Sequence, residues 1–123
     1  ESRLLISGPN TGKVNRMLHL TEKNFTVETK RGPLPNVVMF YAVWCGKCAM
    51  MKPFVEEIEQ KYRKRIRFCE VDIDESPLLA ADYEADIVPT FVFFQNGQFL
   101  GSMQGIIDEN VFERRLQKIF RNC

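Results

Sequence analysis

The stretch Trp44-Cys45-Gly46-Lys47-Cys48 stands where a continuous apolar run gives way to a helical pattern of apolar residues. It places two sulfurs at a strand-to-helix junction, with a spacing that suits a turn and lets a disulfide close between its ends. A sulfur at a helix N-terminus lies beside unsatisfied backbone N–H groups and the positive end of the helix dipole, and both favour a thiolate over a thiol. A Cys-x-x-Cys motif within a strand–helix–strand pattern is typical of a redox site.

Composition and charge exclude several classes of protein. The chain has 123 residues, of which 45% are hydrophobic and 27% charged, as in a globular domain with one core and unlike a disordered chain. Its net charge of +1 creates no global field that would draw it to nucleic acid or to a membrane surface. The longest apolar runs, near residues 37–44 and 87–94, are far shorter than the ~20 residues of a membrane helix. We expect one monomeric domain that binds neither nucleic acid nor membranes.

The four cysteines are too few and too unevenly spaced for a secreted scaffold held together by disulfides. They favour a reducing compartment, the cytoplasm, in which one pair carries out chemistry; the alternative is an exported protein from which a signal has been removed. Zinc is disfavoured at Cys45 and Cys48, because a structural zinc site needs four ligands and only His19, Cys69 and Cys123 remain to supply them. Cys69 falls within an expected strand, where a buried small hydrophobe is the default.

The pattern of hydrophobic residues predicts an α/β domain over residues 17–123, after a flexible N-terminal arm over residues 1–16 that is rich in turn formers. In the first half of the chain it predicts an edge strand at 17–20, a short helix capped by Thr21 and ending near Thr29, a buried strand at 37–43 and a long helix from Gly46 with Pro53 inside it. In the second half it predicts a strand at 66–73, a helix at 78–85, a strand at 91–94, its hairpin partner at 98–104 and a last helix capped by Asp108. Two strand–helix–strand crossovers followed by a hairpin at Asn96-Gly97 give a mixed sheet with helices on both faces.

These motifs resemble those of the thioredoxin family over roughly residues 17–121. The matching features, in family order, are the Trp-Cys-Gly-x-Cys motif at 44–48, the helix proline Pro53, the segment Val71-Asp72-Ile73-Asp74, the turn Val88-Pro89-Thr90, the Asn96-Gly97 hairpin and the glycine Gly105. A lone Cys-x-x-Cys would carry little weight, whereas the proline turn and the hairpin that follow it make the resemblance specific. The resemblance implies the thioredoxin fold, a central mixed β-sheet flanked by helices on both faces.

The resemblance also implies a dithiol–disulfide cycle that reduces protein disulfides. Cys45 would attack a substrate disulfide as a thiolate and form a mixed disulfide, and Cys48 would then attack Cys45 and release the reduced substrate. The redox-active disulfide between Cys45 and Cys48 would serve in place of any bound cofactor. The implied partners are proteins with exposed disulfides and an electron donor of the thioredoxin-reductase type, dependent on flavin or on an iron–sulfur centre.

Residues around the cysteines would shape the substrate site in the family pattern. Pro89 corresponds to the family's cis-proline, which packs against the two cysteines and presents backbone to an extended substrate segment. Trp44 would shield the disulfide and support its loop. The other positions in this group are Gly46, Lys47, Val88 and Gly105.

Two positions depart from the family pattern. Lys47 stands where thioredoxins usually have proline, and an ammonium about 8 Å from the Cys45 sulfur would favour its thiolate by roughly 0.5–2 kcal/mol and move the reduction potential in the oxidising direction. Met39 stands where thioredoxins commonly bury an aspartate beneath the motif, and Glu70 stands where the neighbouring strand often has a lysine. We therefore hypothesise that Glu70 accepts the proton of Cys48. The alternative is that Glu70 points to solvent.

The sequence leaves two other functions open. A disulfide oxidant or isomerase is one, because the lysine within the motif moves the potential in that direction and Phe40-Tyr41-Ala42 is similar to disulfide-isomerase domains. A non-catalytic interaction module with the same fold is the other, and the presence of both motif cysteines counts against it.

Overall fold

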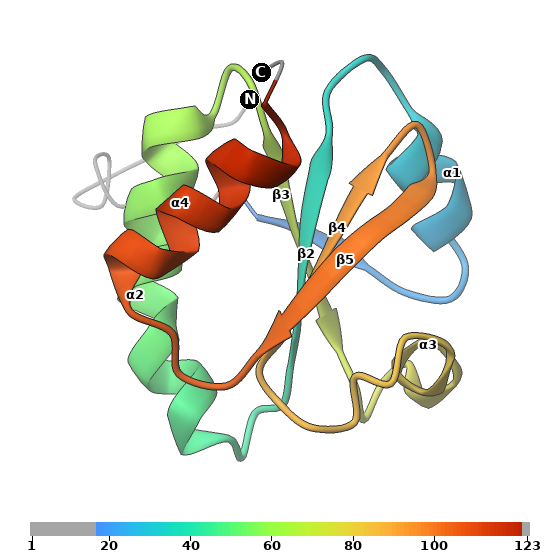
Figure 1. The fold of residues 1–123 in the computed structure, drawn as a ribbon. Coiled ribbons are helices and arrows are strands. Elements are labelled where there is room, and N and C mark those ends of the chain that lie inside the picture. Colours follow the sequence, from blue (N-terminus) through green and yellow to red (C-terminus); the bar gives the residue numbers. More distant parts are fainter. Residues whose placement is uncertain (1–16, 122–123) are drawn as a thin grey trace, which may run out of the picture.

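The computed structural model describes residues 17–121, which form a five-stranded sheet covered by helices (Figure 1). In chain order the elements are β1 (Leu18–Leu20), α1 (Phe25–Lys30), β2 (Asn36–Tyr41), α2 (Gly46–Tyr62), β3 (Arg67–Asp72), α3 (Pro77–Asp82), β4 (Thr90–Gln95), β5 (Gln98–Gln104) and α4 (Glu109–Ile119). This order and the α/β class are those predicted from the sequence. The predicted arm, residues 1–16, and the last two residues of the predicted domain lie outside the described residues.

The sheet is mixed, with the strand order β1-β3-β2-β4-β5. β1, β3 and β2 run parallel, whereas β4 pairs antiparallel with both β2 and β5. The β4–β5 hairpin turns at Asn96 and Gly97, whose φ angles of 55° and 78° are those of a tight hairpin turn. A Cβ atom at Gly97 would lie 2.6 Å from the exposed, flexible side chain of Lys30, so the positive φ is the main reason for glycine at this turn.

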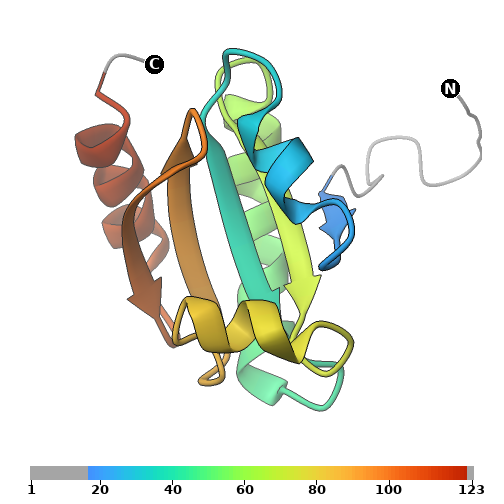
Figure 2. The same cartoon turned by 90° about the vertical axis from the view of Figure 1, so that its right-hand side faces the viewer.

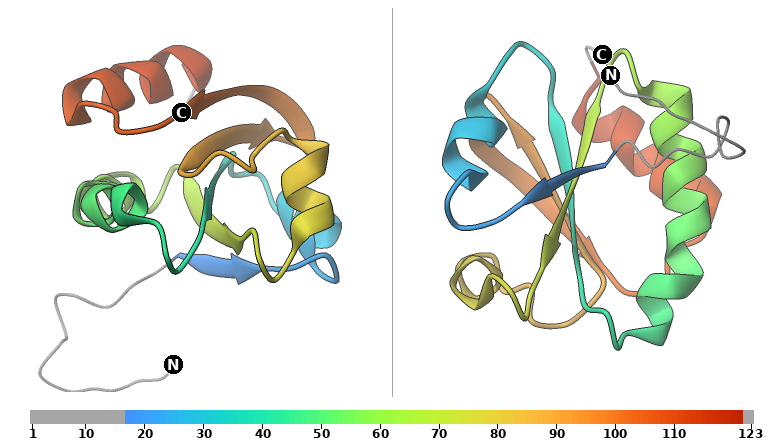
Figure 3. Two further views of the ribbon diagram at one scale, coloured as in Figure 1. Left: turned by 90° about the horizontal axis from the view of Figure 1, so that it is seen from below. Right: turned by 180° about the vertical axis from the view of Figure 1, so that it is seen from behind.

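Helices cover both faces of the sheet. α2 and α4 lie against one face, and α1 and α3 lie against the other (Figures 2 and 3). Five fully buried aromatic rings dominate the core: Phe40, Phe91, Phe93, Phe94 and Phe112. The rings of Phe91 and Phe112 meet edge to face with their centroids 4.8 Å apart, which attaches α4 to β4.

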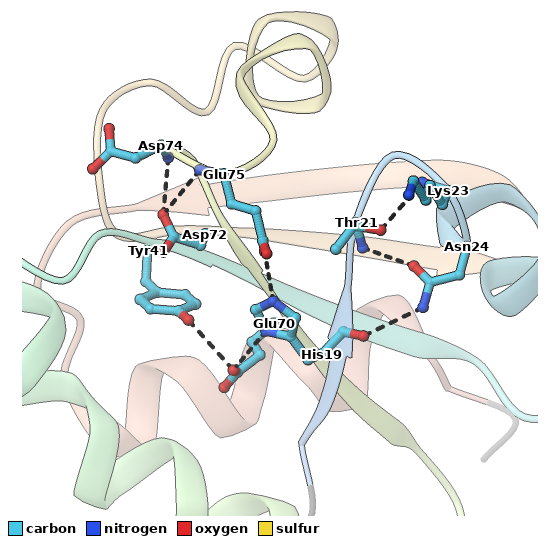
Figure 4. Close-up of polar contacts among 9 residues, drawn as sticks. All are labelled: His19, Thr21, Lys23, Asn24, Tyr41, Glu70, Asp72, Asp74 and Glu75. Carbon is cyan, nitrogen blue, oxygen red and sulfur yellow. Dashed lines mark hydrogen bonds and ion pairs between the residues drawn. The ribbon is translucent and has the colours of Figure 1, made fainter.

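Helix α1 begins later than the sequence predicts. The assignment of Thr21 as its cap is wrong, because the helix starts at Phe25 and Asn24 occupies the capping position. The side-chain oxygen of Asn24 accepts the backbone N–H of Thr21 at 2.7 Å, and the Thr21 hydroxyl accepts the N–H of Lys23 at 3.2 Å (Figure 4). These local bonds close a turn ahead of the helix, and such turns compete with helical hydrogen bonding.

Replacing Phe112 with alanine should lower the free energy of unfolding by about 3–5 kcal/mol, because it removes a fully buried ring and leaves a cavity beside β4. Val111→Ala on the same helix is the control, since Val111 is 44% exposed and its truncation should change that free energy by less than about 0.5 kcal/mol. Urea denaturation measures both variants. Equal losses of stability would contradict the assignment of the buried face of α4.

Candidate active site

Cys45 and Cys48 lie where β2 ends and α2 begins. Cys45 occupies the capping position of α2, and its sulfur accepts the backbone N–H of Cys48 at 3.1 Å. The Cys45 thiol also donates to the carbonyl oxygen of Val88, 3.7 Å away. Both cysteines are reduced and buried, with 7% and 5% of their surfaces exposed. The Cys45 sulfur is therefore held between the first turn of α2 and the loop before β4.

The loop before β4 closes the other side of this junction. The Val88–Pro89 peptide bond is cis, and Pro89 is buried. The Pro89 carbonyl accepts the backbone N–H of Gly105 at 2.8 Å, just after β5 ends. Gly105 has a φ of 89°, which would strain a residue with a side chain. The structure thus brings Val88, Pro89 and Gly105 together on the side of the Cys45 sulfur.

Exposed apolar side chains surround the cysteines. Trp44 is 67% exposed, and its indole N–H donates to the Asp74 carboxylate at 2.8 Å, which ties it to the loop after β3. Val43, Ile87 and Ile106 are also exposed and directly adjoin Trp44, Val88 and Gly105 in the chain. The sequence does not single out Ile87 or Ile106, because an isolated apolar residue in a loop has no periodicity to indicate its exposure. The prediction of a buried strand as far as Val43 is wrong at its end, because β2 ends at Tyr41 and Val43 is 84% exposed.

The two residues between the cysteines are both exposed. A Cβ atom at Gly46 would meet no other atom within 4 Å, so packing does not require glycine there. The Lys47 ammonium is surrounded by water, which screens its charge.

A cavity of about 270 Å³ opens beside the two sulfurs. Met39, Tyr41, Lys52 and Glu70 share its lining with both cysteines. The sequence predicts Glu70 in this region but does not single out Tyr41 or Lys52. Their spacing could have indicated this position, because Lys52 follows Cys48 by about one helical turn and Tyr41 shares a strand face with Met39.

Glu70 lies at the centre of a polar group beside this cavity (Figure 4). It stands opposite Met39 of β2 and His19 of β1 in the strand register, so the three side chains share one face of the sheet. One carboxylate oxygen of Glu70 contacts Nδ1 of His19 at 3.1 Å and accepts the hydroxyl of Tyr41 at 3.5 Å. The Glu70 side chain is 17% exposed. The carboxylate therefore does not point freely into solvent, and Glu70 and Cys48 both line the same cavity.

The surroundings of these groups change their proton affinities. Burial, followed by the neighbouring Cys45 sulfur, raises the pKa of Cys48 above that of an ordinary thiol. Burial and then the charge of Glu70 raise the pKa of Tyr41 to about 12. Hydrogen bonds with Glu70 and Glu75 raise the pKa of His19. At neutral pH, Cys48 therefore keeps its proton and needs an acceptor before its sulfur becomes a nucleophile.

Cys69 lies outside this arrangement. It is fully buried in β3, and its thiol faces the side-chain oxygen of Asn36 at 3.9 Å. Burial raises its pKa to about 12, so it remains a protonated, apolar side chain. Within residues 17–121, no cluster of three or more histidine, cysteine or acidic side chains has the arrangement of a metal site.

Comparison with known proteins identifies the family. A model of the thioredoxin family matches residues 16–118. The chain belongs to the thioredoxin family. Thioredoxin 1 of Nostoc sp. is 33% identical over 99 residues, which are 80% of this chain and 92% of the relative. The crystal structure of mitochondrial thioredoxin 3 from Saccharomyces cerevisiae matches with a TM-score of 0.75 and 34% identity, over 83% of this chain and 94% of that chain.

The chain is therefore a thiol–disulfide oxidoreductase with the thioredoxin fold. Thioredoxins are protein-disulfide reductases that act on disulfides of other proteins and are themselves reduced by thioredoxin reductase. The oxidant or isomerase and the non-catalytic module, both left open by the sequence, are not favoured, because these relatives are thioredoxins. Across the described part of the thioredoxin domain, every helix is too short or too polar to span a bilayer.

Iodoacetamide should alkylate Cys45 at least about tenfold faster than Cys48 in the reduced protein at pH 7, because the raised pKa of Cys48 keeps its sulfur protonated. The rate at Cys48 should increase about tenfold for each pH unit, since its thiolate is a minor species until the pH reaches that pKa. Peptide mass spectrometry after timed quenching measures both rates, with buried Cys69 as the internal control. Equal labelling of the two cysteines, or a Cys48 rate that does not change with pH, would contradict this ordering.

Proposed function

We propose that this thioredoxin reduces protein disulfides through a cycle in which Cys45 attacks and Cys48 resolves. The Cys45 thiolate attacks one sulfur of the substrate disulfide, forms a mixed disulfide and releases one substrate thiolate. The Cys48 thiolate then attacks the Cys45 sulfur, forms the Cys45–Cys48 disulfide and releases the second substrate thiolate. Two electrons pass from the protein to the substrate, so no bound cofactor is needed. The observation that carries the proposal is the 3.1 Å hydrogen bond between the Cys48 N–H and the Cys45 sulfur, which stabilises negative charge on that sulfur.

We assign substrate docking to the exposed apolar side chains around Cys45. Trp44, Ile87 and Ile106 are exposed and directly adjoin Cys45, Val88 and Gly105 in the chain, and together they offer apolar surface to an extended segment. The exposed Lys47 and Gly46 complete its border, and Val88, Pro89 and Gly105 supply its backbone floor. The docking surface thus selects proteins with accessible, flexible disulfide segments.

Glu70 is the proposed acceptor for the proton of Cys48. Met39 cannot take this proton, and among residues 17–121 Glu70 is the one carboxylate that lines the cavity. The volume of about 270 Å³ is large enough for water, which would carry the proton from Cys48 to Glu70. Tyr41 and His19 fix the position of the carboxylate at the opposite wall.

The electron donor belongs to the thioredoxin-reductase class and returns the Cys45–Cys48 disulfide to the dithiol. We place the protein in a reducing compartment, the cytoplasm, because Cys69 is a free buried thiol and the cycle must run toward substrate reduction. The expected reduction potential is close to the value of about −270 mV that is typical of thioredoxins. A potential well above about −200 mV would instead support the oxidant or isomerase.

A two-step reaction with an aromatic disulfide that releases thionitrobenzoate tests the cycle and Glu70 together. In a Cys123→Ser background, which removes the thiol that lies outside the described residues, the protein should release one equivalent when Cys45 attacks and a second when Cys48 resolves. Cys48→Ser should stop after the first equivalent, and Glu70→Gln should slow the second by about 10–100-fold at pH 7, because it removes the proton acceptor. Glu57→Gln, the same change at an exposed position of α2, should leave both steps unchanged.

The direction of the Glu70→Gln effect separates proton transfer from simple electrostatics. If Glu70 acted only through its negative charge, its neutralisation would favour the Cys48 thiolate and speed the second step. A faster or unchanged second step would therefore overturn the role of Glu70. Release of two equivalents by Cys48→Ser would overturn the cycle itself.

A further inference from the structure

His19 joins two carboxylates at the edge of the sheet. Its Nδ1 lies 3.1 Å from a carboxylate oxygen of Glu70, and its Nε2 lies 2.6 Å from a carboxylate oxygen of Glu75 (Figure 4). The chain has no other histidine. The proposed function uses Glu70 but assigns nothing to His19 beyond holding it.

The two contacts of His19 can both be hydrogen bonds in only one protonation state of its ring. An ionised carboxylate only accepts hydrogen bonds, and a neutral imidazole has a single N–H to donate. Both contacts can therefore be hydrogen bonds only when the ring is an imidazolium with two N–H groups. The raised pKa of His19, caused first by its hydrogen bond to Glu70 and then by that to Glu75, agrees with this geometry.

The titratable groups around the pair come from two strands, the loop after β3 and one helix. β3 contributes Glu70 itself and Asp72, and the loop after β3 contributes Glu75. β2 contributes the Tyr41 phenol, which donates to the same oxygen of Glu70 that His19 contacts. From α2, the Lys52 ammonium lines the cavity with Glu70. Across residues 17–121, His19 is the group in this set that changes charge closest to neutral pH, because its ordinary pKa is near 6.5.

We propose that His19 is a positioning residue whose charge controls whether Glu70 accepts the proton of Cys48. This proposal rests on the role assigned to Glu70 above. When His19 is an imidazolium, it holds the Glu70 carboxylate as an ion pair, and a proton arriving from Cys48 would have to cancel that pair. When His19 is neutral, the ion pair no longer exists, so the proton passes from Cys48 through water to Glu70 and from there to solvent.

The predicted consequence is a pH-dependent second step. Cys48 loses its proton, its thiolate attacks the Cys45 sulfur, and the substrate thiolate leaves, whatever the state of His19. Loss of the imidazolium charge should accelerate this step by roughly 5–10-fold beyond the pH dependence that Cys48 has by itself. The sign distinguishes this account from a general charge effect, because an imidazolium that acted only as a nearby positive charge would favour the Cys48 thiolate and accelerate the step at low pH.

The test compares the release of the second thionitrobenzoate in the wild-type protein and in His19→Gln between about pH 5.5 and 9. Glutamine keeps a side-chain N–H for Glu70 but cannot become charged. The ratio of the His19→Gln rate to the wild-type rate cancels the ionisation of Cys48. It should fall from roughly 5–10 to about 1 as the pH rises through the midpoint of His19, measured in the wild-type protein from the NMR signals of its single imidazole.

Other variants make the outcome decisive. Glu75→Gln removes the second carboxylate and should move both the NMR midpoint and the kinetic inflection to lower pH, which tests the proposal even if His19→Gln does not fold. In a Glu70→Gln background, adding His19→Gln should leave the rate of the second step unchanged at every pH. A ratio that stays flat across the His19 titration, or one that rises with pH, would overturn the role of His19. If Glu70→Gln by itself changes nothing, the role of Glu70 fails as well, so the two failures are distinguishable.

Discussion

The hydrogen bond from the Cys48 N–H to the Cys45 sulfur is the interaction on which the site depends. It makes a cysteine the cap of α2, so the helix supplies the N–H groups and the dipole that stabilise a thiolate. The buried strand β2 brings the chain to this point, and the loop before β4 places the Val88 carbonyl against the same sulfur. The mixed sheet thus holds the first turn of α2 and the loop before β4 on either side of the Cys45 sulfur.

Burial of the second cysteine creates a conflict that, in the proposed function, the neighbouring strands resolve. Cys48 must be shielded so that its sulfur attacks Cys45 only, yet the same burial keeps it protonated. A methionine on β2 beneath the motif leaves the site without an acid in that strand. The carboxylate comes from the opposite position of β3, and its partner His19 comes from the opposite position of β1. Three adjacent strands thus contribute one side chain each to a single face of the sheet.

Local patterns in the sequence are sufficient to predict the fold. They do not predict contacts between side chains that are far apart in the chain. The uninterrupted apolar run before the motif, the helical spacing after it and the Asn96-Gly97 turn predict their elements correctly, because each depends on residues close together in the chain. The predicted start of α1 is wrong because the Asn24 side chain accepts the N–H of Thr21, which closes a turn before the helix begins at Phe25. The contacts of His19 with Glu70 and Glu75 span 51 and 56 residues, and only the strand register makes them predictable. Glu70 could be placed near the motif through the family resemblance, but its partners could not.

The central claim is that Glu70 and Cys48 share one proton path through the cavity. The most direct test is the chemical shift of the Glu70 carboxyl carbon, followed by NMR from acid to alkaline pH in the reduced and oxidised proteins. A shared proton path predicts an additional alkaline change of this chemical shift in the reduced protein, at the pH where Cys48 ionises, and no such change once the Cys45–Cys48 disulfide has formed. Identical titration curves in the two redox states would contradict it.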